Sequence, residues 1–211
     1  MSKNLLILLI AVAILFSTSC KSETELEREK KKLAEPTVTK GVKPVADSEI
    51  AVIEMEQPAY GTIKIELYSN VAPKMVARFK ELAKEGVYNG TTFHRINQTV
   101  IQGGDPLSKD SDPRNDGSGN SDKPSVPAEF TDVPFETAIV GAARTQDPNS
   151  ANSQFFIMLK REPGFDQKYT VFGKVIEGMS NVRTISGVNP KEGERPLENV
   201  VVKSVTIQPK Q

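Results

Sequence analysis

The feature that most constrains the fold is a series of short apolar runs of strand length between residues 48 and 209. The runs are rich in β-branched and aromatic residues, and turn-forming residues separate them. In order they read IAVIEME, TIKIELY, TTFHRI, TVIQGG, TAIVGAAR, SQFFIML, TVFGKVI and VVVKSVTI. The first two flank QPAYG, a connection of hairpin length. The sequence therefore predicts about eight strands.

Two segments between these strand runs instead have apolar residues at helical spacing. Between residues 71 and 88, Pro73 suits the first turn of a helix and Gly86 suits its end. The apolar side chains that share one face of this helix are Met75, Val76, Phe79, Leu82 and Ala83. A second, brief helix is predicted around Met179, Val182 and Ile185.

Eight strands with short connections and two helices predict a mainly β domain over residues 48–209. We expect a closed antiparallel eight-stranded β-barrel capped by the two α-helices, because closure removes exposed sheet edges. A sandwich of two sheets is the alternative. With 14 glycines, 14 prolines and no tryptophan, the composition suits a turn-rich β protein better than a helical bundle.

The first twenty residues are expected to be a signal peptide. One positive charge in MSKN precedes the apolar run LLILLIAVAILF, and the small residues STS lead to Cys20. Twelve residues span about 18 Å as a helix, which is too short for a hydrocarbon core of about 30 Å. The end resembles a bacterial lipobox, in which the cysteine becomes lipidated. Ser17 departs from that pattern, which usually has an aliphatic residue there.

Lipidation of Cys20 would place the protein in the bacterial cell envelope, anchored to a membrane by its lipid. The alternative is ordinary cleavage near Cys20, which leaves a free thiol. Residues 21–47 are polar and carry charges of both signs, so a flexible tether is expected there. Lys21 directly after the cysteine favours the outer membrane under the sorting rules of some bacteria.

The charge and the counts of reactive residues exclude several functions. Lysine and arginine number 27, as do aspartate and glutamate, so no basic surface for nucleic acid is expected. One cysteine permits no intrachain disulfide, and a histidine-based site would have to use His94 alone. The loop 105–127 is rich in Asp, Asn and Gly, but Arg114 occupies the fifth position of an EF-hand pattern that starts at Asp110. We predict a solvated loop and no metal site.

Four motifs together resemble the cyclophilins, the cyclophilin-type peptidyl-prolyl cis/trans isomerases. They are FHRI, QGGD, NSQFFI and VFGKVIEGM, in that order and at these distances. Each motif alone is weak, whereas four in register are specific. The resemblance spans the domain from first strand to last, about three quarters of the chain. It implies an enzyme without a cofactor that acts on proline-containing polypeptides, and we expect a monomer.

Arg95 and Gln102 match the catalytic positions of that family. Amide resonance opposes rotation about a peptide bond with a barrier of about 18–20 kcal/mol, and a guanidinium near the imide nitrogen favours the twisted form. The resemblance gives this role to Arg95, with Gln102 orienting it and contacting the substrate backbone. Without the resemblance, a surface salt bridge and a strand-end hydrogen bond would explain the same residues. His94 is assigned a structural role, because the reaction transfers no proton.

By the same resemblance, Phe156 forms the floor of an apolar pocket for the proline ring, and Phe155 points the opposite way, into the core. Taken singly, Phe156 and Phe165 are also explained by core packing. The other positions that match the substrate groove are Thr99, Val100, Ala143, Arg144, Gln154, Phe165 and Tyr169.

The chain also departs from the family pattern around the groove. Thr99 stands where a pocket phenylalanine is expected, Val100 where methionine is usual, and Tyr169 where histidine is usual. Gly164 replaces the tryptophan of many eukaryotic members, which predicts weak cyclosporin binding. The loss at Thr99 predicts lower substrate affinity with the chemical step retained.

These observations predict a peptidyl-prolyl isomerase that assists the folding of exported or envelope proteins. One alternative is a chaperone or scaffold module that binds proline peptides with weak or no catalysis. Retention of Arg95 and Gln102 favours the enzyme, whereas Thr99 favours the module. A second alternative is a structural lipoprotein that displays a barrel domain to a partner.

Overall fold

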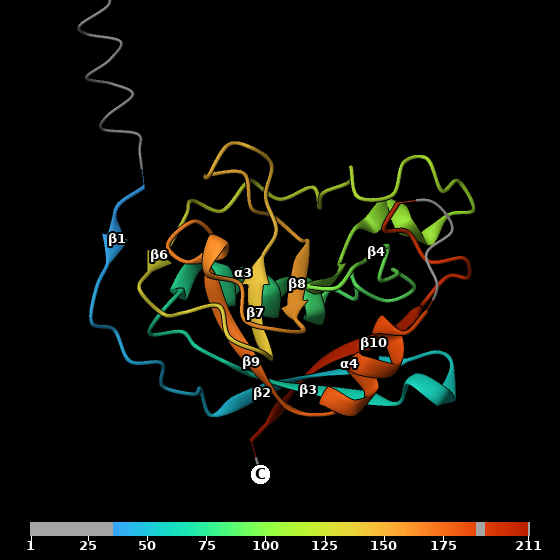
Figure 1. Ribbon diagram of the computed structural model, residues 1–211, viewed down its shortest axis with the longest axis horizontal. Helices are drawn as coiled ribbons and strands as arrows, with labels where there is room; N and C mark the ends of the chain where they lie inside the picture. Colours follow the sequence, from blue (N-terminus) through green and yellow to red (C-terminus); the bar gives the residue numbers. More distant parts are fainter. Residues whose placement is uncertain (1–35, 189–192, 211) are drawn as a thin grey trace, which may run out of the picture. The chain divides into compact units, whose positions relative to one another are not determined.

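The computed structural model describes residues 36–188 and 193–210 (Figure 1). The predicted signal peptide, Cys20 and the first part of the predicted tether lie outside the described residues. Within the described ranges, no helix is both long enough and apolar enough to cross a membrane.

One antiparallel sheet of eight strands organises the domain, and every predicted strand run contributes to it. The sheet order is β10-β2-β3-β9-β7-β8-β5-β4. The strands are β2 (Glu49–Met55), β3 (Thr62–Leu67), β4 (Arg95–Ile96), β5 (Val100–Gly103), β7 (Ile139–Ala142), β8 (Phe155–Met158), β9 (Val171–Glu177) and β10 (Val202–Pro209). A separate parallel pair joins β1 (Val38–Thr39) to β6 (Phe130–Thr131).

Both predicted helices are present, as α3 (Pro73–Lys84) and α4 (Met179–Ser186). All five apolar residues predicted for the inner face of α3 are buried. Gly86 follows the end of this helix with φ of +69°, a conformation that glycine adopts without strain. The shorter α4 buries Val182 and Ile185 and packs beside β3. The described residues also contain three 3₁₀ turns, η1 (Pro58–Tyr60), η2 (Pro106–Lys109) and η3 (Pro163–Phe165).

The sheet is a curled half-barrel and does not close, which corrects the predicted closed barrel. Its edge strands are β10 and β4. The chain segments that precede these strands are joined by the isolated bridge between Thr92 and Val201 and by main-chain hydrogen bonds beside it, not by a ladder. The run TTFHRI was expected to form a full strand, yet only Arg95 and Ile96 enter the ladder. The backbone before them bonds elsewhere, because the Phe93 N–H donates to the Val200 carbonyl.

The two faces of the sheet bury separate hydrophobic clusters. The larger cluster lies between the sheet and the helices and contains Phe155, whose ring meets Phe79 edge-on at 5.4 Å between centroids. The smaller cluster contains Phe156 together with Phe135. Consecutive strand residues point to opposite faces, so the prediction that Phe155 and Phe156 diverge is confirmed.

Residues 36–47 form an N-terminal arm, drawn in blue at the left of Figure 1, which packs against the domain. Val38 pairs with Phe130 in the short parallel ladder. Further along the arm, the Gly41 N–H donates to both carboxylate oxygens of Asp132, at 3.0 and 2.9 Å. Main-chain bonds therefore fix the arm along its length.

The predicted boundary between tether and domain near Ser48 is corrected by this arm, because the folded unit begins at Pro36. Composition suggested a solvated tether up to residue 47. The small apolar side chains of Val42 and Ala46 nevertheless pack against the smaller cluster. At the end of the arm, Asp47 accepts a hydrogen bond from Lys80 at 2.7 Å.

Candidate active site

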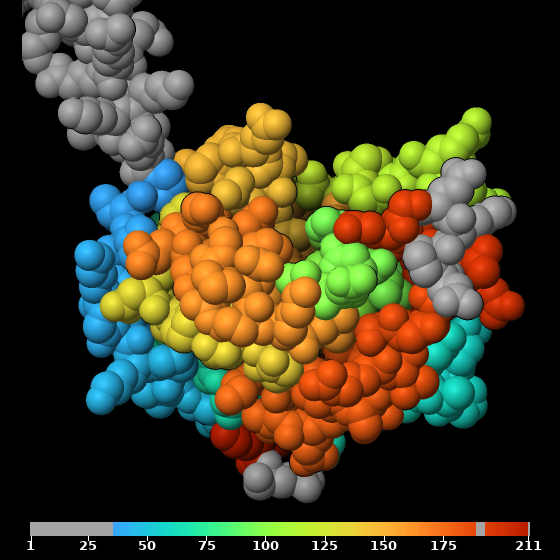
Figure 2. Space-filling model, viewed as in Figure 1, coloured from blue at the N-terminus to red at the C-terminus, as the bar shows by residue number. Residues whose placement is uncertain are grey.

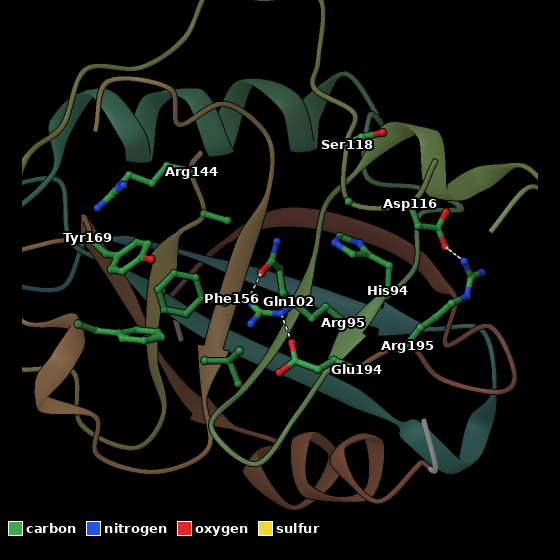
Figure 3. A pocket seen from close by; sticks show the side chains of 14 residues that line it. His94, Arg95, Gln102, Asp116, Ser118, Arg144, Phe156, Tyr169, Glu194 and Arg195 are labelled. Atoms are coloured by element: carbon green, nitrogen blue, oxygen red, sulfur yellow. Dashed lines mark hydrogen bonds and ion pairs between the residues drawn. The ribbon is translucent and has the colours of Figure 1, made fainter. Parts of the chain in front are cut away.

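The two predicted catalytic residues face each other across neighbouring strands. Arg95 in β4 is the ladder partner of Gln102 in β5, so the turn between the strands places the two side chains together. The Arg95 Nη1 donates to Gln102 Oε1 at 3.2 Å (Figure 3). The Arg95 side chain is 46 % exposed, which leaves the guanidinium accessible from the pocket.

A relay of amides fixes the orientation of Gln102. Its Nε2 donates to Gln154 Oε1 at 2.9 Å. In turn, Gln154 Nε2 donates to the carbonyls of Gly117 and Gly119, at 3.0 and 2.8 Å. Because both protons of Gln154 Nε2 go to carbonyls, only its oxygen is left for Gln102. The Gln102 oxygen must then point to the guanidinium.

Aromatic rings form the apolar side of the site. Phe156 is 3 % exposed and lies at the pocket floor. The rings of Phe165 and Tyr169 meet it edge-on, with centroids 5.5 and 5.6 Å away. Arg144 covers the outer side of this group, its guanidinium carbon 4.6 Å from the centre of the Tyr169 ring, a cation–π contact.

The polar and the aromatic sides enclose one pocket of about 560 Å³. In the space-filling view, the surface is notched between the gold-orange and the yellow-green parts of the chain (Figure 2). The predicted site residues that line this pocket are Arg95, Val100, Gln102, Ala143, Arg144, Phe156, Phe165 and Tyr169. A cation is thus held at the rim of an apolar pocket large enough for a proline side chain.

A second pocket of about 320 Å³ shares part of this lining. Gln154, predicted to line the groove, lies in this smaller pocket. Gln102 and Arg144 contribute to both pockets, so an extended peptide can contact the two together.

Thr99, a predicted substrate-binding residue, lines neither pocket. It belongs to the turn between β4 and β5, where its N–H donates to the side chain of Asn97 and its carbonyl accepts from Leu159. Residue 99 is therefore used to form the hairpin turn. Val100, buried at the strand start, provides the wall instead.

Five lining residues were missed by the sequence analysis, namely Asp116, Gly117, Ser118, Glu194 and Arg195. Glu194 forms an ion pair with Arg95 Nε. Arg195 pairs with Asp116 at 2.8 Å. Burial alone would raise the pKa of Glu194, but hydrogen bonds from Arg95 and Asn97 outweigh it and hold that pKa below its usual value. No motif marked residues 193–199, so the sequence carried no signal for them.

His94 lies next to Arg95 and is buried at the pocket wall. Neither ring nitrogen has a hydrogen-bond partner among the described residues. Burial lowers the pKa of the imidazole, although the Asp105 carboxylate opposes the shift. The ring is therefore neutral at pH 7 and adds no charge to that of Arg95.

The loop 105–127 is ordered by a buried carboxylate. Asp105 accepts hydrogen bonds from the N–H groups of Leu107, Gly117 and Gly119, at 2.8, 2.5 and 3.1 Å. These bonds hold the backbone carbonyls that receive Gln154. In the described ranges, the acidic residues of this loop do not gather with others into a group that could hold a metal ion.

Comparisons with known proteins place this geometry in one family. The family model described as "Cyclophilin type peptidyl-prolyl cis-trans isomerase/CLD" matches residues 51–207. A "Probable peptidyl-prolyl cis-trans isomerase" of Brucella suis is 45% identical over 149 residues, which are 68% of this chain and 73% of that protein. The human "Peptidyl-prolyl cis-trans isomerase-like 1" is 35% identical over 152 residues, covering 69% of this chain and 86% of its own length.

The solved structures give the same result. A crystal structure of a cyclophilin type peptidyl-prolyl cis-trans isomerase from Cryptosporidium parvum, in the presence of the dipeptide Ala-Pro, superposes with a TM-score of 0.68. The two chains share 26% sequence identity, and the match covers 76% of this chain and 99% of the other.

Proposed function

Because the chain belongs to the cyclophilin-type peptidyl-prolyl cis-trans isomerases, we propose that Arg95 and Gln102 catalyse rotation about X-Pro bonds and that the enzyme works in a cell envelope. The isomerase activity follows from the family. The assignment of residues rests on one observation. Gln102 accepts a hydrogen bond from the guanidinium of Arg95 at 3.2 Å, beside a pocket whose floor is Phe156.

The proposed mechanism needs no nucleophile and no proton transfer. Partial double-bond character gives the C–N bond its barrier of about 18–20 kcal/mol, and twisting the bond returns a lone pair to the nitrogen. A fixed N–H donor aimed at that lone pair binds the twisted amide more tightly than the planar one. Lowering the barrier by about 5–7 kcal/mol accelerates rotation roughly 10⁴–10⁵-fold.

The aromatic group supplies affinity and a fixed point for the rotation. Burial of the proline ring against Phe156, Phe165 and Tyr169 removes apolar surface from water, at about 25 cal/mol per Å². With the ring held, the acyl part of the substrate rotates over Gln102 and Arg95. The smaller pocket beside Gln154 receives the chain that precedes the proline.

The test is a peptide isomerisation assay on wild type, Arg95→Ala and Arg95→Lys. We expect kcat/KM to fall at least 100-fold in Arg95→Ala and to stay low in Arg95→Lys, since lysine lacks the planar fork that Gln102 orients. Arg183→Ala, on the exposed face of α4, is the matched control and should behave as wild type. Unchanged rates in Arg95→Ala would refute the assignment. Retained peptide binding without acceleration in the wild type would support the binding-module alternative.

The envelope location is supported by the sequence alone. An apolar run of signal-peptide length is followed by STS and Cys20, so lipidation of that thiol would anchor the enzyme to a membrane and present it to exported chains. Mass spectrometry of the mature N-terminus should find a diacylated cysteine, and Cys20→Ser should move the protein from the membrane to the soluble fraction. A soluble wild-type protein would exclude the anchor. We also expect a monomer, which sedimentation of the detergent-solubilised protein will check.

A further inference from the structure

We propose that Glu194 and Asn97 are positioning residues that hold the Nε edge of Arg95 in place for catalysis. This inference rests on the proposed role of Arg95 and deepens it. Glu194 Oε2 accepts from Arg95 Nε, and Glu194 Oε1 accepts from Asn97 Nδ2 at 2.7 Å. The carboxylate therefore bridges the arginine and the hairpin turn that follows it, as Figure 3 shows for the Arg95 side.

Asn97 cannot turn its amide around, because its oxygen is already used. Asn97 Oδ1 accepts from the N–H groups of Thr99 and Val100, both at 2.8 Å. The Nδ2 group must consequently point away from the turn, toward Glu194. The backbone of the short turn between β4 and β5 thus fixes the side chain of Asn97, so that its Nδ2 group donates to the Glu194 carboxylate.

Residue 194 faces hydrogen-bond donors on both sides, and this decides which side chain can stand there. Arg95 Nε and Asn97 Nδ2 are both hydrogen-bond donors, so the side chain of residue 194 must supply two acceptor atoms. A carboxylate supplies two acceptor oxygens, whereas a glutamine supplies one acceptor and one donor. The backbone holds the same residue, since the Ile96 N–H donates to the Glu194 carbonyl at 2.6 Å.

The contacts divide the guanidinium of Arg95 into three parts. Glu194 takes Nε and Gln102 takes Nη1, while Nη2 has no hydrogen-bond partner among the described residues. Holding two corners of a planar group fixes its plane and aims the third corner. We infer that the remaining corner is the one offered to the substrate.

The exposure of the pair argues for orientation as its role. Side chains of Arg95 and Glu194 are 46 % and 42 % exposed, and ion pairs this accessible contribute about 0–1 kcal/mol to stability. The ion pair between Arg95 and Glu194 therefore adds little to stability, but it still restricts the rotamers of the Arg95 side chain. The neighbouring charges are already paired, because Arg195 binds Asp116, and His94 is neutral at pH 7.

The experiment measures kcat and KM separately for Glu194→Ala, Glu194→Gln and Asn97→Ala with a proline test peptide. We expect kcat to fall 10- to 100-fold in Glu194→Ala, with KM changed less than threefold. Glu194→Gln should recover part of this loss, and Asn97→Ala should lose three- to tenfold. Glu198→Ala, exposed on the same segment, is the matched control and should keep wild-type values.

Two further readouts separate positioning from a structural effect. In the Arg95→Ala background, Glu194→Ala should cause no additional loss of kcat, because residues that act through one group are not additive. Wild-type kcat should fall with decreasing pH as Glu194 takes up a proton, and Glu194→Gln should lack that step. Protonation of His94 affects the pH profiles of both proteins equally. The difference between the two kcat–pH profiles therefore reports the protonation of Glu194.

The outcomes distinguish this inference from the assignment on which it rests. If Arg95→Ala is as active as wild type, the assignment of Arg95 fails. If Arg95→Ala loses activity while Glu194→Ala equals Glu198→Ala, only the positioning role is refuted. Equal losses of kcat from Glu194→Ala with and without Arg95 would likewise overturn it.

Discussion

Phe155 and Phe156 are neighbours in β8, yet their rings belong to two different hydrophobic clusters. The Phe155 ring meets Tyr88 edge-on at 5.8 Å between centroids, on the helix side of the sheet. Phe156 meets Phe165 and Tyr169 on the pocket side. One strand therefore supports the core with one residue and lines the proposed substrate pocket with the next.

This division predicts that the same substitution affects stability at one position and substrate binding at the other. Phe155→Leu should lower the free energy of unfolding by about 1 kcal/mol through poorer packing, and leave KM unchanged. Phe156→Leu should raise KM several-fold through the altered floor, with kcat less affected. Denaturant titrations and steady-state kinetics on both variants check this. Equal KM values in the two variants would contradict the assigned floor.

Gly141 in β7 is predicted to keep the floor of the pocket in place. A Cβ there would lie 2.4 Å from Phe156 Cζ and 2.8 Å from Phe135 Cε1, so both rings would have to move. Gly141→Ala should therefore raise KM and lower stability by about 1–3 kcal/mol, as overpacking does. Gly187→Ala at the end of α4 is the control, since its nearest atom would be 3.3 Å away. Wild-type KM in Gly141→Ala would show that the floor tolerates the shift.

The amide relay behind Gln102 predicts that Gln154→Glu is harmful despite its small size. The new carboxylate would face the carbonyls of Gly117 and Gly119 in place of two N–H donors, at a position only 8 % exposed. Unsatisfied buried groups cost about 1–3 kcal/mol each, so the midpoint of unfolding should fall and kcat with it. Gln98→Glu, on the exposed turn, should leave both quantities unchanged. A stable, fully active Gln154→Glu would mean that the relay does not orient Gln102.

The N-terminal arm is predicted to stabilise the domain. A chain that begins at Ser48 loses the pairing of Val38 and the bonds of Gly41 to Asp132, each bond worth about 1 kcal/mol. Its free energy of unfolding should be lower by on the order of 3 kcal/mol than that of a chain that begins at Pro36. Asp132→Ala in the longer chain should show part of this loss. Identical denaturation curves would show that the arm contributes nothing.

His94 is predicted to make stability depend on pH in mildly acidic solution. Burial lowers its pKa below the ordinary value of 6.5, so the unfolded chain binds a proton first as pH falls. The contribution of neutral His94 is complete above about pH 6.5 and is lost as pH drops through the folded pKa.

Because the chain has one histidine, its imidazole resonances can be followed by NMR without ambiguity. They should titrate with a midpoint below 6.5. A variant His94→Leu should show a shallower loss of stability between pH 7 and pH 5 than wild type does. A midpoint at or above 6.5 would contradict the prediction, whether or not the variant folds.

Local features of the fold were predictable because they depend on local periodicity. The apolar face of α3 and the eight strand runs follow directly from residue spacing. Arg95 and Gln102 are also close in sequence, so one hairpin suffices to bring them together. Tyr169 and Phe165 came from the family resemblance, and the structure brings both to the ring of Phe156.

The features that were missed depend on contacts between distant segments. Glu194 reaches Arg95 from 99 residues away and stands in no motif. The barrel stays open because β4 is only two residues long, and the backbone before it meets the backbone before β10 at an isolated bridge instead of along a ladder. Residues such as Val42 in the arm are too few to alter a polar composition, although their packing decides where the folded unit begins.

The two edges of the half-barrel determine how readily this enzyme would aggregate with other polypeptide chains through its sheet. Unpaired strand edges invite foreign strands to add, and incompletely folded chains are rich in such strands. Here β4 offers only two ladder residues, and Ile96 already donates its N–H to Glu194. At the opposite border, Val202 exchanges hydrogen bonds with Thr91 and Gly90. A prolyl isomerase built this way offers a proline-containing chain little unpaired backbone at these two borders on which to aggregate.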